Sequence, residues 1–192
     1  MRPIDLGGFE DTFSRDDDPW RTFSDRDEAL KRAAIMHGLG GRILGRVLEL
    51  GAGNGSNSVA IADRALRLEA TEGTEAGTRL VERALAGNAR ARAVRLALPG
   101  RFPRATYDAV VVAELLYYLS IMDLNQVARD VAKGLAPGGC LVLAHHRIDF
   151  HDFAQHAEGI HARFLAATGV KWRPQQQRRT GRWRVQSYRM EV

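Results

Sequence analysis

The chain has 192 residues, of which 45% are hydrophobic and 27% are charged. These values exclude an intrinsically disordered chain, and the length suits one domain with a substantial core and a small appendage. The net charge is +5, and the basic residues gather locally only near the C-terminus, at Lys171, Arg173, Arg178, Arg179, Arg182, Arg184 and Arg189. Because the excess charge is otherwise spread along the chain, a solvated arginine-rich surface is favoured over a nucleic-acid interface.

The single cysteine, Cys140, excludes an internal disulfide and lies in an apolar run typical of a buried strand. No N-terminal stretch resembles a signal peptide, and no run approaches the ~18 apolar residues of a membrane span. We therefore expect a cytoplasmic protein with no membrane partner. No pattern specifies its oligomeric state.

Residues 1–24 are expected to form a lid, because they are too irregular for a long element and too aromatic for a disordered tail. Their aromatic residues are Phe9, Phe13, Trp20 and Phe23. A cap helix is predicted to follow, beginning after Asp25 and stopped by the glycines at 38–41. The positions that define its apolar face are Ala29, Leu30, Ala33, Ala34 and His37. The predicted division is thus a lid and cap helix over 1–41 and the main domain over 42–192.

Short apolar runs then alternate with helical patterns. Strands are expected over 47–50, 68–71, 93–97, 109–113 and 140–144, and helices over 57–65, 78–86 and 127–135. This alternation predicts a parallel sheet with helices on both faces. A helix over about 150–167 and strands over 170–178 and 183–192 follow. The last two strands are joined by only a few residues and must therefore be antiparallel. We predict a doubly wound α/β domain with a mostly parallel seven-stranded sheet and an antiparallel C-terminal hairpin.

The first motif is the run Val47 to Ser56, in which an apolar strand feeds the glycine-rich turn Gly51-Ala52-Gly53-Asn54-Gly55 before a helix. Such a turn lets the backbone approach a nucleotide-like ligand at a helix N-terminus. The dinucleotide fingerprint requires glycine at 56, where this chain has serine. Glu49 before the turn also disfavours a pyrophosphate and suits a sulfonium or an ammonium.

Two further motifs end strands in a carboxylate. Glu72 follows the glycine-rich turn by about twenty residues, where a carboxylate can accept hydrogen bonds from both ribose hydroxyls. An ordinary surface glutamate is the alternative, since Glu69 and Glu75 lie close by. The strand over 107–113 ends in Glu114 and the pair Tyr117-Tyr118. A fourth motif, Leu135-Ala136-Pro137-Gly138-Gly139, is predicted to turn a helix into the next strand.

These four segments, over about residues 45–145, resemble the motifs of the Rossmann-like class I S-adenosylmethionine-dependent methyltransferases. More narrowly, the segments 17–20, 111–119 and 135–139 resemble the nodulation-protein S family of N-methyltransferases, which methylate an amino sugar. The resemblance implies an enzyme with S-adenosylmethionine as the donor and S-adenosylhomocysteine as the product. It implies that Glu49, Gly51, Gly53 and Gly55 surround the methionine part of the donor.

The same resemblance assigns Glu72 to the donor ribose and Trp20 to a lid over the donor, and Leu98 and Ala113 complete the predicted donor site. Many relatives have an acidic residue near the adenine, but this chain has Leu96-Ala97-Leu98-Pro99 there. Adenine recognition is therefore expected to use backbone groups and apolar contact.

The acceptor is expected beyond the carboxyl ends of the strands. Glu114, Tyr118 and His145 are the predicted catalytic residues, and helix capping or core packing is the alternative role for the first two. Strand alternation allows only one of His145 and His146 to face the cleft. No metal site is predicted, because histidines at 151, 156 and 161 lie about 140° apart around a helix.

The predicted function is methyl transfer to a small-molecule acceptor, an amine or amino sugar. Two alternatives stay open. One is an RNA methyltransferase or nucleic-acid-binding module that uses the arginine-rich hairpin, and the other is a nicotinamide-dependent oxidoreductase. Salt-dependent binding to RNA would support the first, and binding of NAD would support the second.

Overall fold

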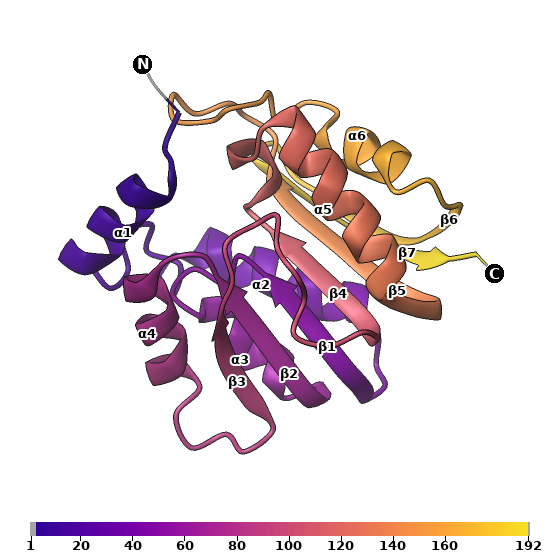
Figure 1. Ribbon diagram of the computed structural model, residues 1–192, viewed down its shortest axis with the longest axis horizontal. Helices are drawn as coiled ribbons and strands as arrows, with labels where there is room; N and C mark the ends of the chain where they lie inside the picture. Colours follow the sequence, from indigo (N-terminus) through magenta and orange to yellow (C-terminus); the bar gives the residue numbers. More distant parts are fainter. Residues whose placement is uncertain (1–2, 192) are drawn as a thin grey trace.

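The computed structural model describes residues 3–191, which form one seven-stranded sheet with helices on both faces (Figure 1). The strand order is β3-β2-β1-β4-β5-β7-β6, with β1 to β5 parallel and β7 antiparallel to both of its neighbours. The strands are β1 (Leu44–Leu50), β2 (Ala65–Glu72), β3 (Ala91–Arg95), β4 (Tyr107–Ala113), β5 (Leu135–His146), β6 (Trp172–Arg179) and β7 (Trp183–Met190). The predicted Rossmann-like fold with its antiparallel hairpin is confirmed.

The helices are α1 (Leu6–Arg15), α2 (Arg26–Leu39), α3 (Ser56–Ala62), α4 (Glu75–Ala84), α5 (Ile121–Gly134) and α6 (Ile160–Ala167), with a 3-10 turn η1 (Leu116–Tyr118). Helices α2, α3 and α4 share a core with Val47 and Val111, and α5 and α6 share the opposite core with Leu48 and Val110. Alternate residues of each central strand therefore face different helical layers. No helix within residues 3–191 has the length and apolar character needed to cross a bilayer.

The chain builds the sheet outward from β1 through β2 to β3 and then returns to place β4 on the other side of β1. The connections after β1 and after β4 therefore leave in opposite directions. A crevice opens beyond the carboxyl ends of strands at such a reversal of strand order. The fold thus places the glycine-rich turn after β1 beside Glu114 after β4.

The N-terminal segment differs from the prediction, because residues 6–15 form the regular helix α1. The Asp5 side chain caps it by accepting a hydrogen bond from the Gly8 amide at 3.0 Å. Phe9 and Phe13, four residues apart, lie on one face of this helix, and Phe13 is buried. Two adjacent glycines at 7 and 8 lower the helix propensity and conceal the element in the sequence.

Helix α2 begins after its N-cap Asp25, as predicted, but it buries a different face. The side chains that it buries are Lys31, Ala34, Ile35 and Leu39, whereas Leu30 is 39% exposed. Of the predicted apolar face only Ala34 is buried, and its other four positions are exposed. The error in the prediction arises from Lys31, a charged residue that the packing places inside.

Two predicted features near β5 also need correction. The predicted helix over 150–167 begins only at Ile160, because residues 150–159 form a loop. The amides of Ala154 and Gln155 in this loop both donate to the Tyr117 carbonyl, at 2.8 and 3.0 Å. The predicted turn over 135–139 is instead the irregular start of β5, where Tyr107 pairs with Leu135 and Ala109 with Cys140.

Candidate active site

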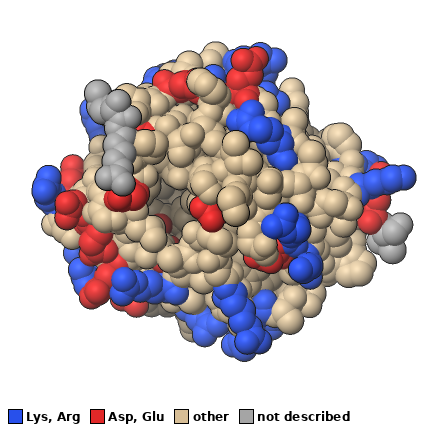
Figure 2. All heavy atoms as spheres, turned by 45° about the horizontal axis from the view of Figure 1, so that its top comes forward, with Lys and Arg blue, Asp and Glu red and all other residues tan. Residues whose placement is uncertain are grey.

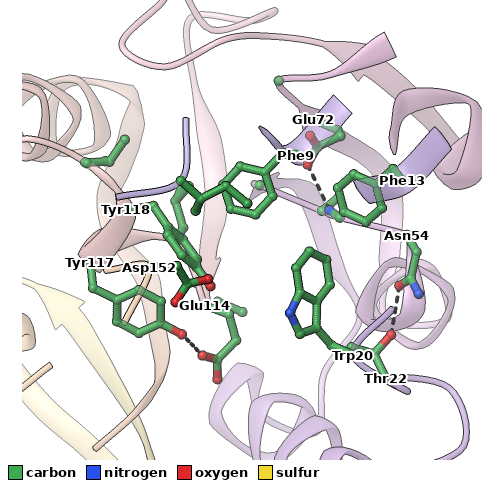
Figure 3. Close-up of a pocket in the computed structure, with 18 of the residues that line it drawn as sticks. Phe9, Phe13, Trp20, Thr22, Asn54, Glu72, Glu114, Tyr117, Tyr118 and Asp152 are labelled. Carbon is green, nitrogen blue, oxygen red and sulfur yellow. Dashed lines mark hydrogen bonds between the residues drawn. The ribbon is translucent and has the colours of Figure 1, made fainter. Parts of the chain in front are cut away.

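A cavity of about 450 Å³ lies at the carboxyl ends of β1, β2 and β4, beneath α1 (Figure 3). Gly51, Gly53 and Asn54 of the glycine-rich turn form its floor, and both glycines have positive φ values of 66° and 60°. A left-handed backbone at these positions favours glycine and leaves room for a ligand to approach.

Glu72 lines this cavity and is only 7% exposed. Its carboxylate accepts hydrogen bonds from the amides of Gly53 and Thr74, each at 3.0 Å. Burial raises the pKa of Glu72, and the hydrogen bonds from Thr74 and Gly53 act in the opposite direction. Glu72 is therefore a buried residue joined to the glycine-rich turn, and not an ordinary surface glutamate.

Glu49 and Gly55 do not line the cavity, contrary to the contacts expected for them. Alternation along β1 places Glu49 on the side of α3, where it is 1% exposed and accepts a hydrogen bond from the Ser58 hydroxyl at 2.5 Å. Burial raises its pKa to about 7. A Cβ at Gly55 would lie 2.9 Å from the Cβ of Ala84, so this glycine serves the packing of α4.

The glycine-rich turn, Glu72 and the segment after β3 line the part of the cavity that is predicted to hold the donor, called the donor half below. Its far end is apolar. Leu96 and Leu98 follow β3 and line it, together with Ala113 at the end of β4. The Leu96 amide donates to the Glu72 carbonyl at 2.8 Å, which fixes this segment beside β2. These three side chains give this part of the cavity an apolar lining.

The N-terminal segment forms an aromatic wall over the glycine-rich turn. Phe9, Phe13 and Trp20 line the cavity, and the Phe13 and Trp20 rings meet edge to face with centroids 5.4 Å apart (Figure 3). Several polar contacts hold this wall in place, two of which connect it to the glycine-rich turn and to α4. Asn54 donates to the Asp18 carboxylate at 2.9 Å, and Glu10 accepts from the Glu75 amide at 2.7 Å.

Phe23, the fourth aromatic residue predicted for the lid, does not line the cavity and is 50% exposed.

The rest of the cavity, called the acceptor half below, is where the acceptor is predicted to bind, and Glu114 lies at its centre. Its Oε1 lies 2.6 Å from Lys31 Nζ, and its Oε2 lies 2.8 Å from His146 Nδ1 and also accepts the Tyr117 hydroxyl. Its φ of 51° is unusual for a glutamate. Such backbone strain persists where surrounding contacts fix the residue, and it is concentrated at active sites.

The electrostatics of this cluster favour charged groups. Burial alone would raise the pKa of Glu114, but Lys31 and the hydrogen bond from His146 outweigh it and lower that pKa to about 2. Burial alone would lower the pKa of Lys31, but Glu114 and Glu28 outweigh it and raise that pKa. Lys31 is 2% exposed and also lies 2.8 Å from Glu28. The pair is therefore an ion pair at neutral pH.

His145, predicted to be catalytic, does not line the cavity, whereas His146 does. The Nε2 atom of His145 accepts hydrogen bonds from the amides of Leu115 and Leu116, at 3.3 and 3.2 Å. Its Nδ1 lies 3.0 Å from His161 Nε2 on α6. Burial and His161 hold the pKa of His145 far below its ordinary value. His145 thus lies outside the cavity, where it joins the turn after β4 to α6, and His146 is the histidine of the pair that faces the cleft.

Tyr118, also predicted to be catalytic, lines the cavity and meets Phe9 edge to face with centroids 4.9 Å apart. Burial and the Asp152 and Glu114 carboxylates raise its pKa. The phenol therefore stays protonated at neutral pH. Tyr117 stacks on Phe153 at a centroid distance of 3.6 Å, which closes the same end of the cavity.

The cavity is acidic, although the chain as a whole has a net charge of +5. Its carboxylate residues are Asp5, Glu28, Glu72, Glu114, Asp123 and Asp152. Lys31 is the only lysine or arginine that lines it among residues 3–191. Figure 2 shows acidic side chains at the hollow on this face, with the lysines and arginines farther out. The local field therefore favours a cation.

The histidines at 151, 156 and 161 lie apart, but for a different reason from the one predicted. His151 lines the cavity, His156 lies 2.6 Å from Asp149 on the surface, and His161 is buried beside His145. The first two belong to a loop, so the helical spacing argument does not apply to them. Residues 3–191 contain no group of three or more His, Cys, Asp or Glu side chains placed to hold a metal ion.

The glycine-rich turn, the strand-end carboxylate and the crevice between β1 and β4 define a nucleotide-binding domain of the methyltransferase type. Residues 48–141 match a family model described as a methyltransferase domain. The chain thus carries a methyltransferase domain, and the sequence prediction of an enzyme with S-adenosylmethionine as its donor is confirmed, since solved structures with this fold include complexes with S-adenosylmethionine or its demethylated product.

Solved structures share this fold. The N-methyltransferase NodS from Bradyrhizobium japonicum, in complex with S-adenosylhomocysteine, superposes with a TM-score of 0.84 at 18% identity, over 97% of this chain and 98% of NodS. A candidate methyltransferase from Pseudomonas syringae gives 0.74 at 25% identity, over 86% and 99% of the two chains.

DhpI in complex with S-adenosylhomocysteine gives a TM-score of 0.75 at 19% identity, over 97% of this chain and 95% of DhpI. No curated protein sequence matches the chain significantly. At 18% identity the likeness to NodS extends to the fold alone, so the narrower family resemblance is not established by it.

Proposed function

We propose that this methyltransferase transfers the methyl group of S-adenosylmethionine to an amine nitrogen of a small molecule. The observation that carries this proposal is the acidic cavity, in which Lys31 is the only lysine or arginine lining it within residues 3–191. Glu72 would hold the donor ribose, and Leu98 and Ala113 would contact its adenine. Gly51 and Gly53 would face the methionine part, with Trp20 above it.

An acceptor with a phosphate or carboxylate would find no cation available in the described part of this cavity, because Lys31 already contacts both Glu114 and Glu28. An ammonium group would instead find Asp152, which lies near Glu114 and Tyr118 (Figure 3). The Asp152 carboxylate forms no hydrogen bond or ion pair with the other described residues. The aromatic rings of Tyr118 and Phe9 add faces that attract cations.

An RNA acceptor is less well supported. The arginines near the C-terminus belong to the hairpin of β6 and β7, and β6 is the edge strand farthest from β3 in the sheet. None of these arginines lines the cavity. A nicotinamide-dependent oxidoreductase is not supported either, since residues 48–141 match a methyltransferase domain.

The proposal is tested by incubating the purified protein with S-adenosylmethionine and matched acceptors. Glucosamine and spermidine would serve as amines, glucose and a dicarboxylic acid as amine-free counterparts, and a transfer RNA as the nucleic acid. We expect S-adenosylhomocysteine to form with at least one amine, and mass spectrometry to locate the methyl group on nitrogen. Methylation confined to the hydroxyl, carboxylate or RNA acceptors would contradict the proposal.

A second test concerns the donor half. Glu72→Gln should weaken binding of S-adenosylhomocysteine by about ten- to a hundredfold, because it removes one or two charge-assisted hydrogen bonds to the ribose. Isothermal titration calorimetry would measure this change, with the exposed Glu75→Gln as the matched control. Unchanged affinity in Glu72→Gln would place the ribose contact elsewhere.

A further inference from the structure

The Glu114 carboxylate binds one ring nitrogen of His146, and the other ring nitrogen has no hydrogen-bond partner among residues 3–191. Its Nδ1 lies 2.8 Å from Glu114 Oε2, and its backbone amide donates to the same oxygen at 3.3 Å. The side chain is 16% exposed and lines the cavity, and its ring meets Phe150 edge to face with centroids 5.4 Å apart. The Nε2 atom has no hydrogen-bond partner within residues 3–191.

This geometry determines which nitrogen carries the proton in the neutral ring. An ionised carboxylate only accepts hydrogen bonds, so Nδ1 must donate to Glu114. The Nε2 atom is then left with a free lone pair. Histidine tautomers are set in this way by the hydrogen bond that the other nitrogen makes.

The groups around His146 keep Glu114 in its ionised form. Lys31 from α2 and the Tyr117 hydroxyl from η1 both contact the Glu114 carboxylate, and Glu28 from α2 contacts Lys31. His151 and Asp152 of the loop after β5 line the same part of the cavity. The Glu114 carboxylate is therefore available as the acceptor of the His146 Nδ1–H bond.

We infer that His146 Nε2 is the base that accepts the proton of the acceptor amine, with Glu114 and Lys31 as the residues that position it. This inference rests on the proposed amine acceptor. The ammonium loses one proton to Nε2, and its nitrogen lone pair attacks the methyl carbon. The new C–N bond forms as the C–S bond breaks, and both electrons of that bond stay on sulfur.

The first test does not depend on turnover. Nitrogen-15 NMR of the histidine rings should show His146 in the Nδ1–H form when neutral, with its signals identified by their loss in His146→Gln. Glu114→Gln should shift this ring toward the Nε2–H form, because the acceptor of the Nδ1–H bond is no longer a carboxylate. A neutral His146 in the Nε2–H form in the native protein would overturn the inference.

The second test measures turnover with the amine that the native protein methylates. His146→Gln should lower turnover by about a hundredfold or more, as loss of a general base does, and leave S-adenosylhomocysteine affinity and the melting temperature unchanged. The matched control is His156→Gln, whose ring is 86% exposed and outside the cavity. Full turnover in His146→Gln would overturn the inference.

The two proposals fail in different ways. If the native protein methylates only hydroxyl or carboxylate acceptors, the amine proposal fails. The role of His146 as a base is then decided by its tautomer and by turnover of His146→Gln on that acceptor.

Discussion

Replacing Lys31 with methionine is expected to destabilise the fold by about 3 kcal/mol, measured by denaturant unfolding at neutral pH. The substitution removes the cation that lies 2.6 Å from Glu114 and 2.8 Å from Glu28, so two carboxylates face each other without it. Turnover should fall as well, because Glu114 would lose one of the contacts that fix it beside His146.

The matched control is Arg79→Met, which removes an exposed ion pair with Glu75 at 2.6 Å. An exposed pair of this kind contributes about 0.3–0.5 kcal/mol. The double variant Lys31→Met, Glu114→Gln should regain part of the lost stability, because Glu28 is then the only one of the two carboxylates left without the lysine. A Lys31→Met protein as stable as the native one would show that the pair contributes no net stability.

The dependence of stability on pH gives a further readout of the same pair. The pKa of Glu114 is lowered by folding, so its contribution is present above the unfolded pKa and is lost as the pH falls toward about 2. The free energy of unfolding of the native protein should therefore decline in acid. In Lys31→Met this decline should be smaller, because the carboxylate has lost the partner that lowers its pKa.

The sequence predicted the sheet, and three residues that it assigned to the donor, Gly51, Gly53 and Glu72, line one cavity, because both features depend on local patterns. An apolar strand followed by Gly51 and Gly53 requires a particular backbone, and Glu72 follows at the spacing set by one helix and one strand. Glu49 and Gly55 belong to the same motif, but they serve α3 and α4. Whether these two residues face the cavity or a helix depends on how α3 and α4 pack against the sheet. The spacing of residues within the motif does not specify that packing.

The acceptor half could not be predicted in the same way. Strand alternation separates His145 from His146, but both faces of β5 are apolar, so the pattern does not show which face meets the cleft. The partners of His146 also lie far apart in the sequence, since Glu114 in turn contacts Lys31 from a helix 83 residues earlier in the chain. In a helical pattern, a lysine is normally interpreted as solvent-exposed. Lys31 is buried because it is paired with Glu114, a contact that the sequence pattern does not reveal.

Helix α1 could not be predicted from the sequence, because the composition of residues 6–15 does not favour a helix. Gly7 and Gly8 reduce helix propensity, while the Asp5 cap and the Phe9–Phe13 pair favour the helix by tertiary contact. The aromatic residues therefore have an amphipathic element of their own, contrary to the expectation of an irregular segment. Three of the four, Phe9, Phe13 and Trp20, line the cavity, and their role as a lid over the donor stays a prediction.

Deleting residues 1–24 is expected to lower turnover by about a hundredfold or more while lowering the melting temperature only slightly. Phe9, Phe13 and Trp20 line the cavity above the glycine-rich turn, so their loss would admit water and leave the acceptor poorly aligned. The fold depends less on this segment, because the cluster buried beneath α1 contains only Phe13, Ala76 and Leu80 with Phe9 beside them.

Both quantities should be measured on the deletion variant, together with its affinity for S-adenosylhomocysteine. The matched control is Phe23→Ala, since Phe23 lies in the same segment but is 50% exposed and outside the cavity. It should leave turnover and melting temperature unchanged. A large fall in melting temperature on deletion would mean that the segment fastens α2 and α4 to the core, whereas full donor binding and turnover would remove it from the mechanism. A fall in turnover with stability retained would show that the segment acts as a lid.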